Sequence, residues 1–367
     1  MKPIRLSIGS GAQRGLSLVE LLISITLGLI LLAGITQIFV SSKQGYRVQQ
    51  SNSELQENGR YAMEYIGQAI RHADFWGGVE ASTLLVRGTV DGPAGATTCT
   101  SGWLTDVTKG IYGYDGGSTP PIDCIDSSDY APNTDILVSR YVDPSRHDSS
   151  PTDGLIPDRE ISNGKDGLVE KGFNYLFVRT LTGQFGIVYN LNGSGSNNWD
   201  AVGGDNGTLK AAGIDDEGYF NHRYRTSLLY IRKCSVTVSG QCPTSSDGIP
   251  TLVSAEIKNS GKNLPILSED PLVENVEQMQ ILYGVDQDGN LSVDRYYTAT
   301  DMPASAWQQV IMARVGILVR GSALDSFQDT ETYTLPGGYS YTPAGLDQRY
   351  PRRLIIKDFQ IRNRTRG

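Results

Sequence analysis

The sequence has few residues of the kinds that build catalytic or metal centres. Among its 367 residues there are only three histidines and four cysteines. It lacks a Gly-x-Ser-x-Gly nucleophile motif, a His-Glu-x-x-His pair and a phosphate-binding loop. The pattern therefore indicates that the chain is not an enzyme and that it binds neither a catalytic metal nor a cofactor.

Positive charge is also scarce. The formal net charge is −8, and removal of residues 1–15, which hold three basic and no acidic residues, lowers it to −11. Because phosphate contacts need clustered lysine and arginine, this balance argues against nucleic acid as a partner. We interpret the basic residues near the C-terminus as charges that protect an exposed strand edge: Arg349, Arg352, Arg353, Lys357, Arg362, Arg364 and Arg366.

Proline is absent between Pro3 and Pro93, and an apolar run from Leu16 to Val40 contains Glu20 as its only charge. As a helix these 25 residues reach about 37 Å, enough to cross a bilayer. A secretory signal peptide has a shorter apolar core, and a plain membrane anchor does not explain the sequence around Glu20. The basic residues before the span predict a cytoplasmic N-terminus and a periplasmic remainder.

Glu20, the only charged residue of the span, is a candidate functional residue. A carboxylate deep in lipid costs about 2.5–3.5 kcal/mol on insertion scales, and less near the interface. A partner is therefore expected. We expect it to be the α-amino group that cleavage after Gly15 would create on Leu16.

The residues around this carboxylate resemble the N-terminus of a type IV prepilin. The similar string runs Arg14-Gly15-Leu16-Ser17-Leu18-Val19-Glu20-Leu21-Leu22-Ile23. The resemblance implies that a prepilin peptidase cuts after Gly15 and N-methylates Leu16, although the family usually has phenylalanine there. It also implies that Glu20 pairs with the N-terminus of a neighbouring subunit in the filament; the sequence leaves open a pairing within one chain.

The four cysteines fit an oxidising compartment such as the periplasm. Proximity in sequence favours the disulfides Cys99–Cys124 and Cys234–Cys242, although four cysteines permit three pairings. Zinc is the alternative, but the spacings are not those of a zinc site and no histidine cluster accompanies them.

Beyond the span, apolar residues continue at helical spacing, which predicts one helix over residues 16–75 that ends at Gly77-Gly78. Short β-rich segments follow. They predict strands at 84–87, 135–141, 175–179, 185–189, 227–233, 252–257, 276–285, 314–320 and 354–361, with long loops at 91–132 and 191–218. The expected fold is α+β, a helix packed on an antiparallel sheet with long inserted loops. The expected parts are a leader (1–15), a membrane and filament-core half-helix (16–40), an amphipathic half-helix (41–77) and a β-rich periplasmic domain (78–367).

The C-terminal third resembles PilW-type minor pilins of type IV pili. The residues that carry this similarity are Leu272–Asn290, Asp294–Tyr297, Trp307, Arg314–Arg320 and Arg362–Arg364. The resemblance implies a minor pilin that helps to prime pilus assembly or stands near the tip, first in the inner membrane and then in the fibre. Its partners would be other minor pilins, the major pilin, the prepilin peptidase and the inner-membrane assembly platform. Two alternatives stay open: a minor pseudopilin of a type II secretion system, and a membrane-anchored adhesive or binding protein.

One acidic segment has two interpretations. The alternation Asp286-x-Asp288-x-Asn290-x-Ser292-x-Asp294 is like that of a calcium loop, but Leu291 and Tyr297 stand where an EF-hand has glycine and glutamate. The same segment is a good hairpin turn between two strands, which is the interpretation we favour.

Overall fold

The computed structural model describes residues 17–78, 85–86, 103, 108–144, 173–179, 184–190, 198–201, 221–245, 247–260, 264–324 and 327–365. The chain separates into two compact units, residues 1–52 and 53–367. The first unit contains the beginning of helix α1, and the second contains its end and all strands.

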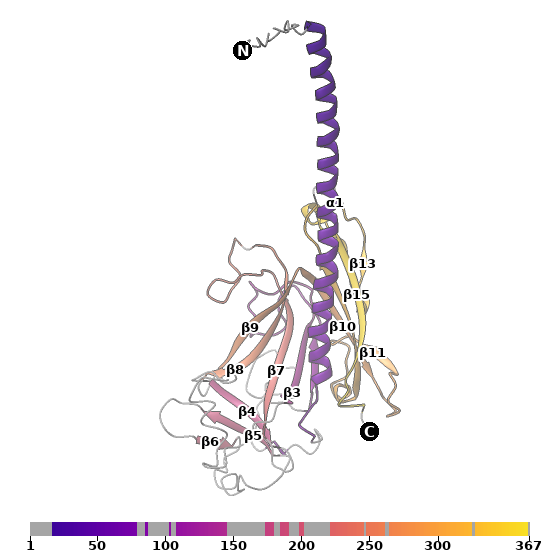
Figure 1. Cartoon of the computed structure of the whole chain (residues 1–367). Helices are drawn as coiled ribbons and strands as arrows, with labels where there is room; N and C mark the ends of the chain where they lie inside the picture. The colour runs from indigo at the N-terminus through magenta and orange to yellow at the C-terminus, as the bar shows by residue number, and fades with distance from the viewer. Residues whose placement is uncertain are drawn as a thin grey trace, which may run out of the picture. The chain divides into compact units, whose positions relative to one another are not determined.

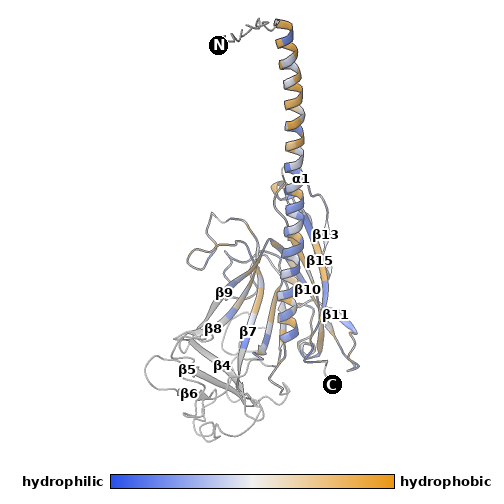
Figure 2. Ribbon diagram, in the orientation of Figure 1, coloured by the Kyte–Doolittle hydropathy of each residue, from blue (hydrophilic) through white to orange (hydrophobic). Residues whose placement is uncertain are grey.

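Helix α1 (Leu18–His72) is one continuous helix of 55 residues, which confirms the helix predicted over residues 16–75. Its N-terminal half is mainly hydrophobic, whereas hydrophobic and hydrophilic residues alternate further along (Figure 2). The helix ends where Asp74 and then Gly77 and Gly78 adopt positive φ angles of 65°, 69° and 92°. The helix has already ended at His72, so Asp74 marks its end, and the two glycines of the predicted stop follow in the next turn.

A four-stranded antiparallel sheet has the order β11-β10-β12-β15. Its strands are β10 (Val276–Val285), β11 (Arg295–Tyr297), β12 (Val310–Arg320) and β15 (Arg352–Gln360). The end of α1 lies beside β10 and β15 (Figure 1). An apolar stripe of this half-helix joins β10 and β12 in a shared core; its members are Leu55, Ala62, Met63, Ile66, Ile70 and Ala73.

A second sheet has nine strands, with β1-β5-β4-β8-β7-β3-β2 as its main path and with β6 and β9 attached to β5 and β8. Its strands are β1 (Leu85–Val86), β2 (Ile111–Tyr114), β3 (Ile136–Val142), β4 (Phe173–Arg179), β5 (Gln184–Asn190), β6 (Asn198–Ala201), β7 (Asn221–Arg232), β8 (Thr251–Ser260) and β9 (Leu264–Glu274). All its pairings are antiparallel except that of β1 with β5.

The two faces of this larger sheet belong to two different cores. Leu137 on β3 packs into the core shared with α1 and β10, whereas Ile136 and Val138 pack into a separate core around Trp103. Alternation along a strand has a period of two, so successive side chains point to opposite faces. Along β2, β3, β7 and β8 the sheet therefore has apolar packing on both faces.

The chain passes from one sheet to the other at a single residue, Asn275. It follows β9 of the large sheet and precedes β10 of the small one, with a φ of 63°. Asparagine tolerates this left-handed conformation better than most residues. The turn is fixed by Arg320, whose backbone N–H donates to the Asn275 carbonyl at 2.9 Å.

The fold confirms the predicted α+β arrangement of a long helix on antiparallel sheets. Each of the nine predicted strands has a counterpart. The two predicted long loops are interrupted by strands, because β2 lies within 91–132 and β6 within 191–218. The described part also contains a short hairpin and three short 3₁₀ helices. The hairpin consists of β13 (Tyr333–Thr334) and β14 (Ser340–Tyr341), and the helices are η2 (Ala304–Gln309), η3 (Pro336–Gly338) and η4 (Gly345–Arg349).

Candidate functional site: the N-terminal half of the helix and the anchorage of its end

Glu20 lies in the first turn of α1, where the predicted span begins. Its backbone N–H donates to the Ser17 hydroxyl at 3.1 Å, so Ser17 caps the helix. Ser-x-x-Glu is the sequence of a capping box, and an acid in the first turn also suits the helix dipole. Glu20 therefore has a local role that our sequence analysis missed, although the Ser17-Leu18-Val19-Glu20 spacing could have shown it.

The apolar residues that follow Glu20 are exposed in the single chain. Between Leu18 and Val40 the large apolar side chains are 45–75% exposed. The hydroxyls of Ser24, Thr26 and Thr36 donate back to helix carbonyls at 2.7–2.9 Å, which satisfies them without water. Among the described residues, α1 is the one helix that is long and apolar enough to cross a membrane. This half of the helix is suited to lipid or to packing against similar helices.

Gly15 and Leu16, the predicted cleavage and methylation sites, lie outside the described residues. The proposed partner of Glu20 is the amino group of Leu16, so their pairing stays a prediction. Gly28 and Gly34, in the apolar half of the helix, have no atom within 4 Å of an added Cβ in the single chain.

Two other glycines of α1 make the close contacts. An added Cβ at Gly59 would lie 2.2 Å from Cδ1 of Ile355, and one at Gly67 would lie 2.5 Å from Cε1 of Phe359. Both partners belong to β15. The two glycines thus let the helix backbone approach this strand closely. The sequence of the helix alone does not show this role, because it depends on the position of β15.

The end of α1 is anchored by the end of the described chain. The side-chain amide of Asn363 donates to the carbonyls of Arg71 and Ala73 at 3.1 and 3.0 Å. The Arg364 guanidinium pairs with the carboxylate of Asp74 and donates to the Trp307 carbonyl at 2.6 Å. Helix ends leave carbonyls without partners, and these side chains satisfy some of them.

The basic residues of the C-terminal segment therefore divide into two groups. Arg353 and Lys357 are exposed on β15, an end strand of the small sheet, as expected of a protected edge. Arg352, in contrast, is fully buried and pairs with Glu277 at 2.6 Å and with Asp329 at 3.3 Å. For Arg352 and Arg364 the edge interpretation is wrong, because both hold neighbouring elements together.

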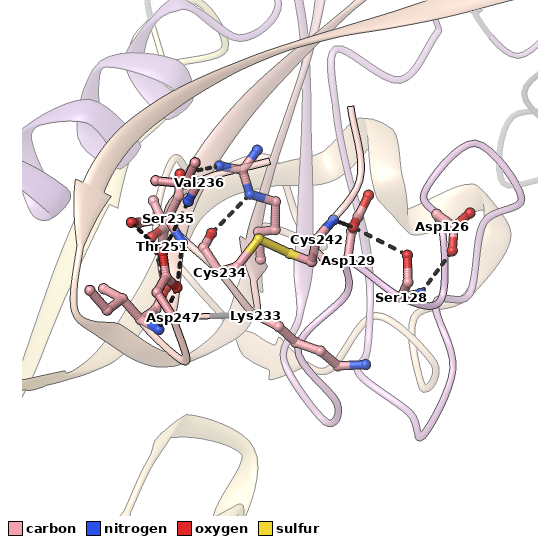
Figure 3. The surroundings of a disulfide bond; sticks show 12 residues. Asp126, Ser128, Asp129, Lys233, Cys234, Ser235, Val236, Cys242, Asp247 and Thr251 are labelled. Carbon is pink, nitrogen blue, oxygen red and sulfur yellow. Dashed lines mark hydrogen bonds between the residues drawn. A yellow bond between two sulfur atoms is a disulfide. The ribbon is translucent and has the colours of Figure 1, made fainter. Parts of the chain in front are cut away.

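The predicted disulfide Cys234–Cys242 is present, with its Cα atoms 5.8 Å apart (Figure 3). Cys124 is not a free thiol, but Cys99 lies outside the described residues, so the Cys99–Cys124 pairing stays a prediction. The disulfide excludes these two thiols as zinc ligands.

The acidic segment after β10 connects it to β11 as a hairpin, which agrees with the turn interpretation. One oxygen from each of Asp286, Asp288 and Asp294 lies within 4.8 Å of the others. The carboxylate of Asp286 accepts the backbone N–H groups of Gly289 and Leu291 at 2.7 and 2.8 Å, and that of Asp294 accepts Gln287 at 2.7 Å. These turn contacts account for the gathering of the three carboxylates.

A half-open cavity of about 350 Å³ lies between β2 and the segment before η2. Tyr112 and Trp307 in its lining pack on each other with ring centroids 4.3 Å apart. The carboxylate of Asp115 accepts the backbone N–H groups of Ala299 and Thr300, each at 2.8 Å. These contacts join two segments of the fold, and in the described lining they form no acid–base pair.

Two family models match the chain. Residues 241–363, about a third of the chain, match the model described as Type IV Pilus-assembly protein W, and residues 11–36 match the Prokaryotic N-terminal methylation motif. No curated protein and no solved structure matches it.

The first match contains β10, β12 and β15, the strands on which α1 packs, together with Asn363, which caps the end of the helix. The second contains Gly15, Leu16 and Glu20. Residues 241–363 are therefore similar to type IV pilus-assembly proteins of the PilW type, and the N-terminus carries a prepilin N-terminal methylation motif.

Proposed function

We propose that this chain is a minor pilin that primes assembly of a type IV pilus and stands at or near its tip. The observation that carries the proposal is the exposed apolar half-helix with Glu20 in its first turn. In the membrane this half-helix is solvated by lipid tails. In a filament the same surface packs against the helices of other subunits.

The parts of the chain follow from this role. Residues 1–15 are the leader removed by the prepilin peptidase, and Leu16 is the methylated N-terminus. Residues 16–40 span the inner membrane and later lie in the filament core. Residues 41–77 form the amphipathic half-helix, and residues 78–367 form the periplasmic domain. The chain is a substrate of the peptidase and catalyses nothing itself.

Glu20 supplies the recognition between subunits. A buried charge without a partner costs about 3–5 kcal/mol, whereas one with a well-placed partner is tolerated. An incoming subunit therefore gains most where its Glu20 meets a protonated N-terminal amine. Its partners are other minor pilins and the major pilin, brought together on the inner-membrane assembly platform.

Glu20→Gln tests this role sharply, because glutamine keeps the size of the side chain and the capping-box pattern while it removes the charge. We expect the variant in the native host to be cut after Gly15 and methylated on Leu16, with a normal amount in the membrane. Surface pili should fall at least about tenfold, since an unpaired buried amine costs more than the 1.4 kcal/mol of one factor of ten.

Ser17→Ala is the matched control, because it removes the cap but leaves the charge; its pili should stay within about twofold of wild type, as a lost cap costs about 1 kcal/mol in the helix alone. The proposal fails if Glu20→Gln assembles normally, if the native chain keeps residues 1–15, or if deletion of the whole protein leaves piliation unchanged.

A further inference from the structure

In the loop closed by the Cys234–Cys242 disulfide, apolar side chains are more exposed than two of the polar side chains beside them. Val236 and Val238 are 63% and 62% exposed, whereas Ser235 before them and Thr237 between them are partly buried. Outside α1, five large apolar side chains of the described residues are exposed, and two of them stand in this one loop: Val236, Val238, Leu291, Leu346 and Ile356. We refer to residues 234–242 as the valine loop.

The valine loop is held rigidly. Ser239 and Gly240 form a tight turn with φ angles of 55° and 83°, and the backbones of Val238 and Gln241 bond to each other at 2.8 and 3.2 Å. The buried Arg232 donates to the carbonyls of Cys234 and Ser235 at 3.0 and 2.8 Å. A loop fixed in this way loses little conformational entropy on binding a partner.

Two carboxylates flank the valine loop (Figure 3). Asp126 accepts the Gln241 side-chain amide at 2.6 Å, and the hydrogen bonds from Ser128 hold its pKa below the usual range. Asp247 accepts the hydroxyl and the backbone N–H of Ser235. Burial opposes its charge, but hydrogen bonds from Ile249 and Ser235 outweigh burial and lower its pKa. Both groups are therefore ionised at neutral pH.

The nearby cation does not cancel this charge. The ammonium group of Lys233 donates to the Ser127 carbonyl at 2.9 Å, and its charge helps to lower the pKa of Asp126. One cation therefore stands against two carboxylates, so the charge around the loop stays negative. The valine loop thus presents two apolar side chains inside a negative rim.

We propose that the valine loop is a docking knob for a neighbouring pilus subunit, which receives the two valines in an apolar recess rimmed by lysine or arginine. Apolar anchors at the centre with complementary charge around them are the usual arrangement of specific interfaces. If two copies of this chain met through their valine loops, one acidic rim would face another, which disfavours a symmetric contact between copies. We therefore commit to a different subunit as the occupant. This inference rests on the proposed function, since it names a contact surface for the same assembly.

The test uses the full chain in its native host. Val236→Thr combined with Val238→Thr keeps the shape of both side chains and replaces methyl groups by hydroxyls. A photo-crosslinking amino acid at Thr244, an exposed position beside the loop, reports the neighbour while the valines stay in place. Leu346→Thr is the control, because Leu346 is also exposed, at 73%, but lies elsewhere.

With the native valines we expect Thr244 to crosslink to another subunit whose N-terminus carries a prepilin motif, identified by mass spectrometry. In the double variant the crosslink yield and surface piliation should fall at least about tenfold, the effect of losing about 1.4 kcal/mol at an interface anchor. The melting temperature and the disulfide should be unchanged, because the valines are exposed. Leu346→Thr should behave as wild type.

The docking inference is overturned if the double variant crosslinks within twofold of wild type, or if Thr244 crosslinks only to a second copy of this chain or to no subunit. Deletion of the whole protein distinguishes failure of the proposed function from failure of the docking inference. If deletion leaves pili intact, the proposed function fails; if deletion removes pili but the double variant keeps them, only the docking knob fails.

Discussion

Asp135 joins the two sheets through two hydrogen bonds to β10, and a third binds the segment after β2. It stands just before β3, and its backbone N–H donates to the Met279 carbonyl on β10 at 2.9 Å. Its carboxyl group accepts the backbone N–H groups of Gly116 at 2.9 Å and of Ile281 at 2.7 Å. Burial raises the pKa of this carboxyl group to about 7, against the hydrogen bonds, which favour its charge. A group that connects the sheets therefore titrates near neutral pH.

This shift predicts a stability change with a definite sign. The pKa of Asp135 is about 7 in the folded chain and about 3.9 in the unfolded one, so between these values the folded state binds the extra proton. Its contribution to the free energy of unfolding is complete below about pH 4 and is lost as the pH rises through about 7. Thermal unfolding of wild type and Asp135→Asn at pH 5, 6, 7 and 8 measures this, because the variant should lack that part of the slope. Equal slopes in the two chains would contradict it.

Individual residues were predictable where a motif or a short spacing carries the information. The carboxylate at Glu20 and the Cys234–Cys242 disulfide are of this kind, and the latter is confirmed. The cap on α1 is not, because Asn363 lies 292 residues from the Arg71 carbonyl that it binds. Asp135 looks like an ordinary surface acid in the sequence, since its pKa depends on burial between sheets that only the fold brings together.

At the scale of elements, the close approach of α1 and β15 depends on glycine. Gly67→Ala would place a methyl group 2.5 Å from Cε1 of Phe359, a rigid ring atom. Overpacking of this kind costs about 1–3 kcal/mol, which exceeds the 0.5–1 kcal/mol that alanine gains over glycine in a helix. We therefore expect a lower melting temperature of the globular domain, measured in detergent on the full chain.

Gly45→Ala is the matched control, since no atom lies within 4 Å of its added Cβ. It should leave the melting temperature unchanged or raise it slightly. Equal effects of the two substitutions would show that β15 does not limit the approach of the helix.

The long strands were predictable from their apolar pattern, but β9 was not. This strand contains Pro265 and Pro271, and proline normally argues against a strand. The structure accommodates both prolines because β9 pairs with β8 alone among the described strands. The other missed strands, β2, β6, β11, β13 and β14, have two to four residues, too few to show a period.

At the scale of the whole globular domain, β3 connects two cores. Ile136 packs around Trp103 on one face, and Leu137 packs against α1 and Trp307 on the other. Since both cores share one sheet, we expect the domain to unfold in a single transition.

Ile136→Ala and Leu137→Ala test this expectation from the two sides. Both residues are fully buried, so each substitution should cost about 2–5 kcal/mol. Both should lower the same transition, observed by tryptophan fluorescence and by circular dichroism. Two transitions, each shifted by only one substitution, would show that the cores are independent.

The anchorage of α1 by Asn363 and Arg364 sets the order in which the domain can mature. The helix is synthesised first, but its apolar stripe shares a core with β10 and β12, which begin only at Val276 and Val310, and its last carbonyls bind Asn363. Contacts of such high sequence separation form late. The end of α1 therefore stays open until the chain is made as far as residue 364, and a chain that stopped before Asn363 would leave the carbonyls of Arg71 and Ala73 without this partner.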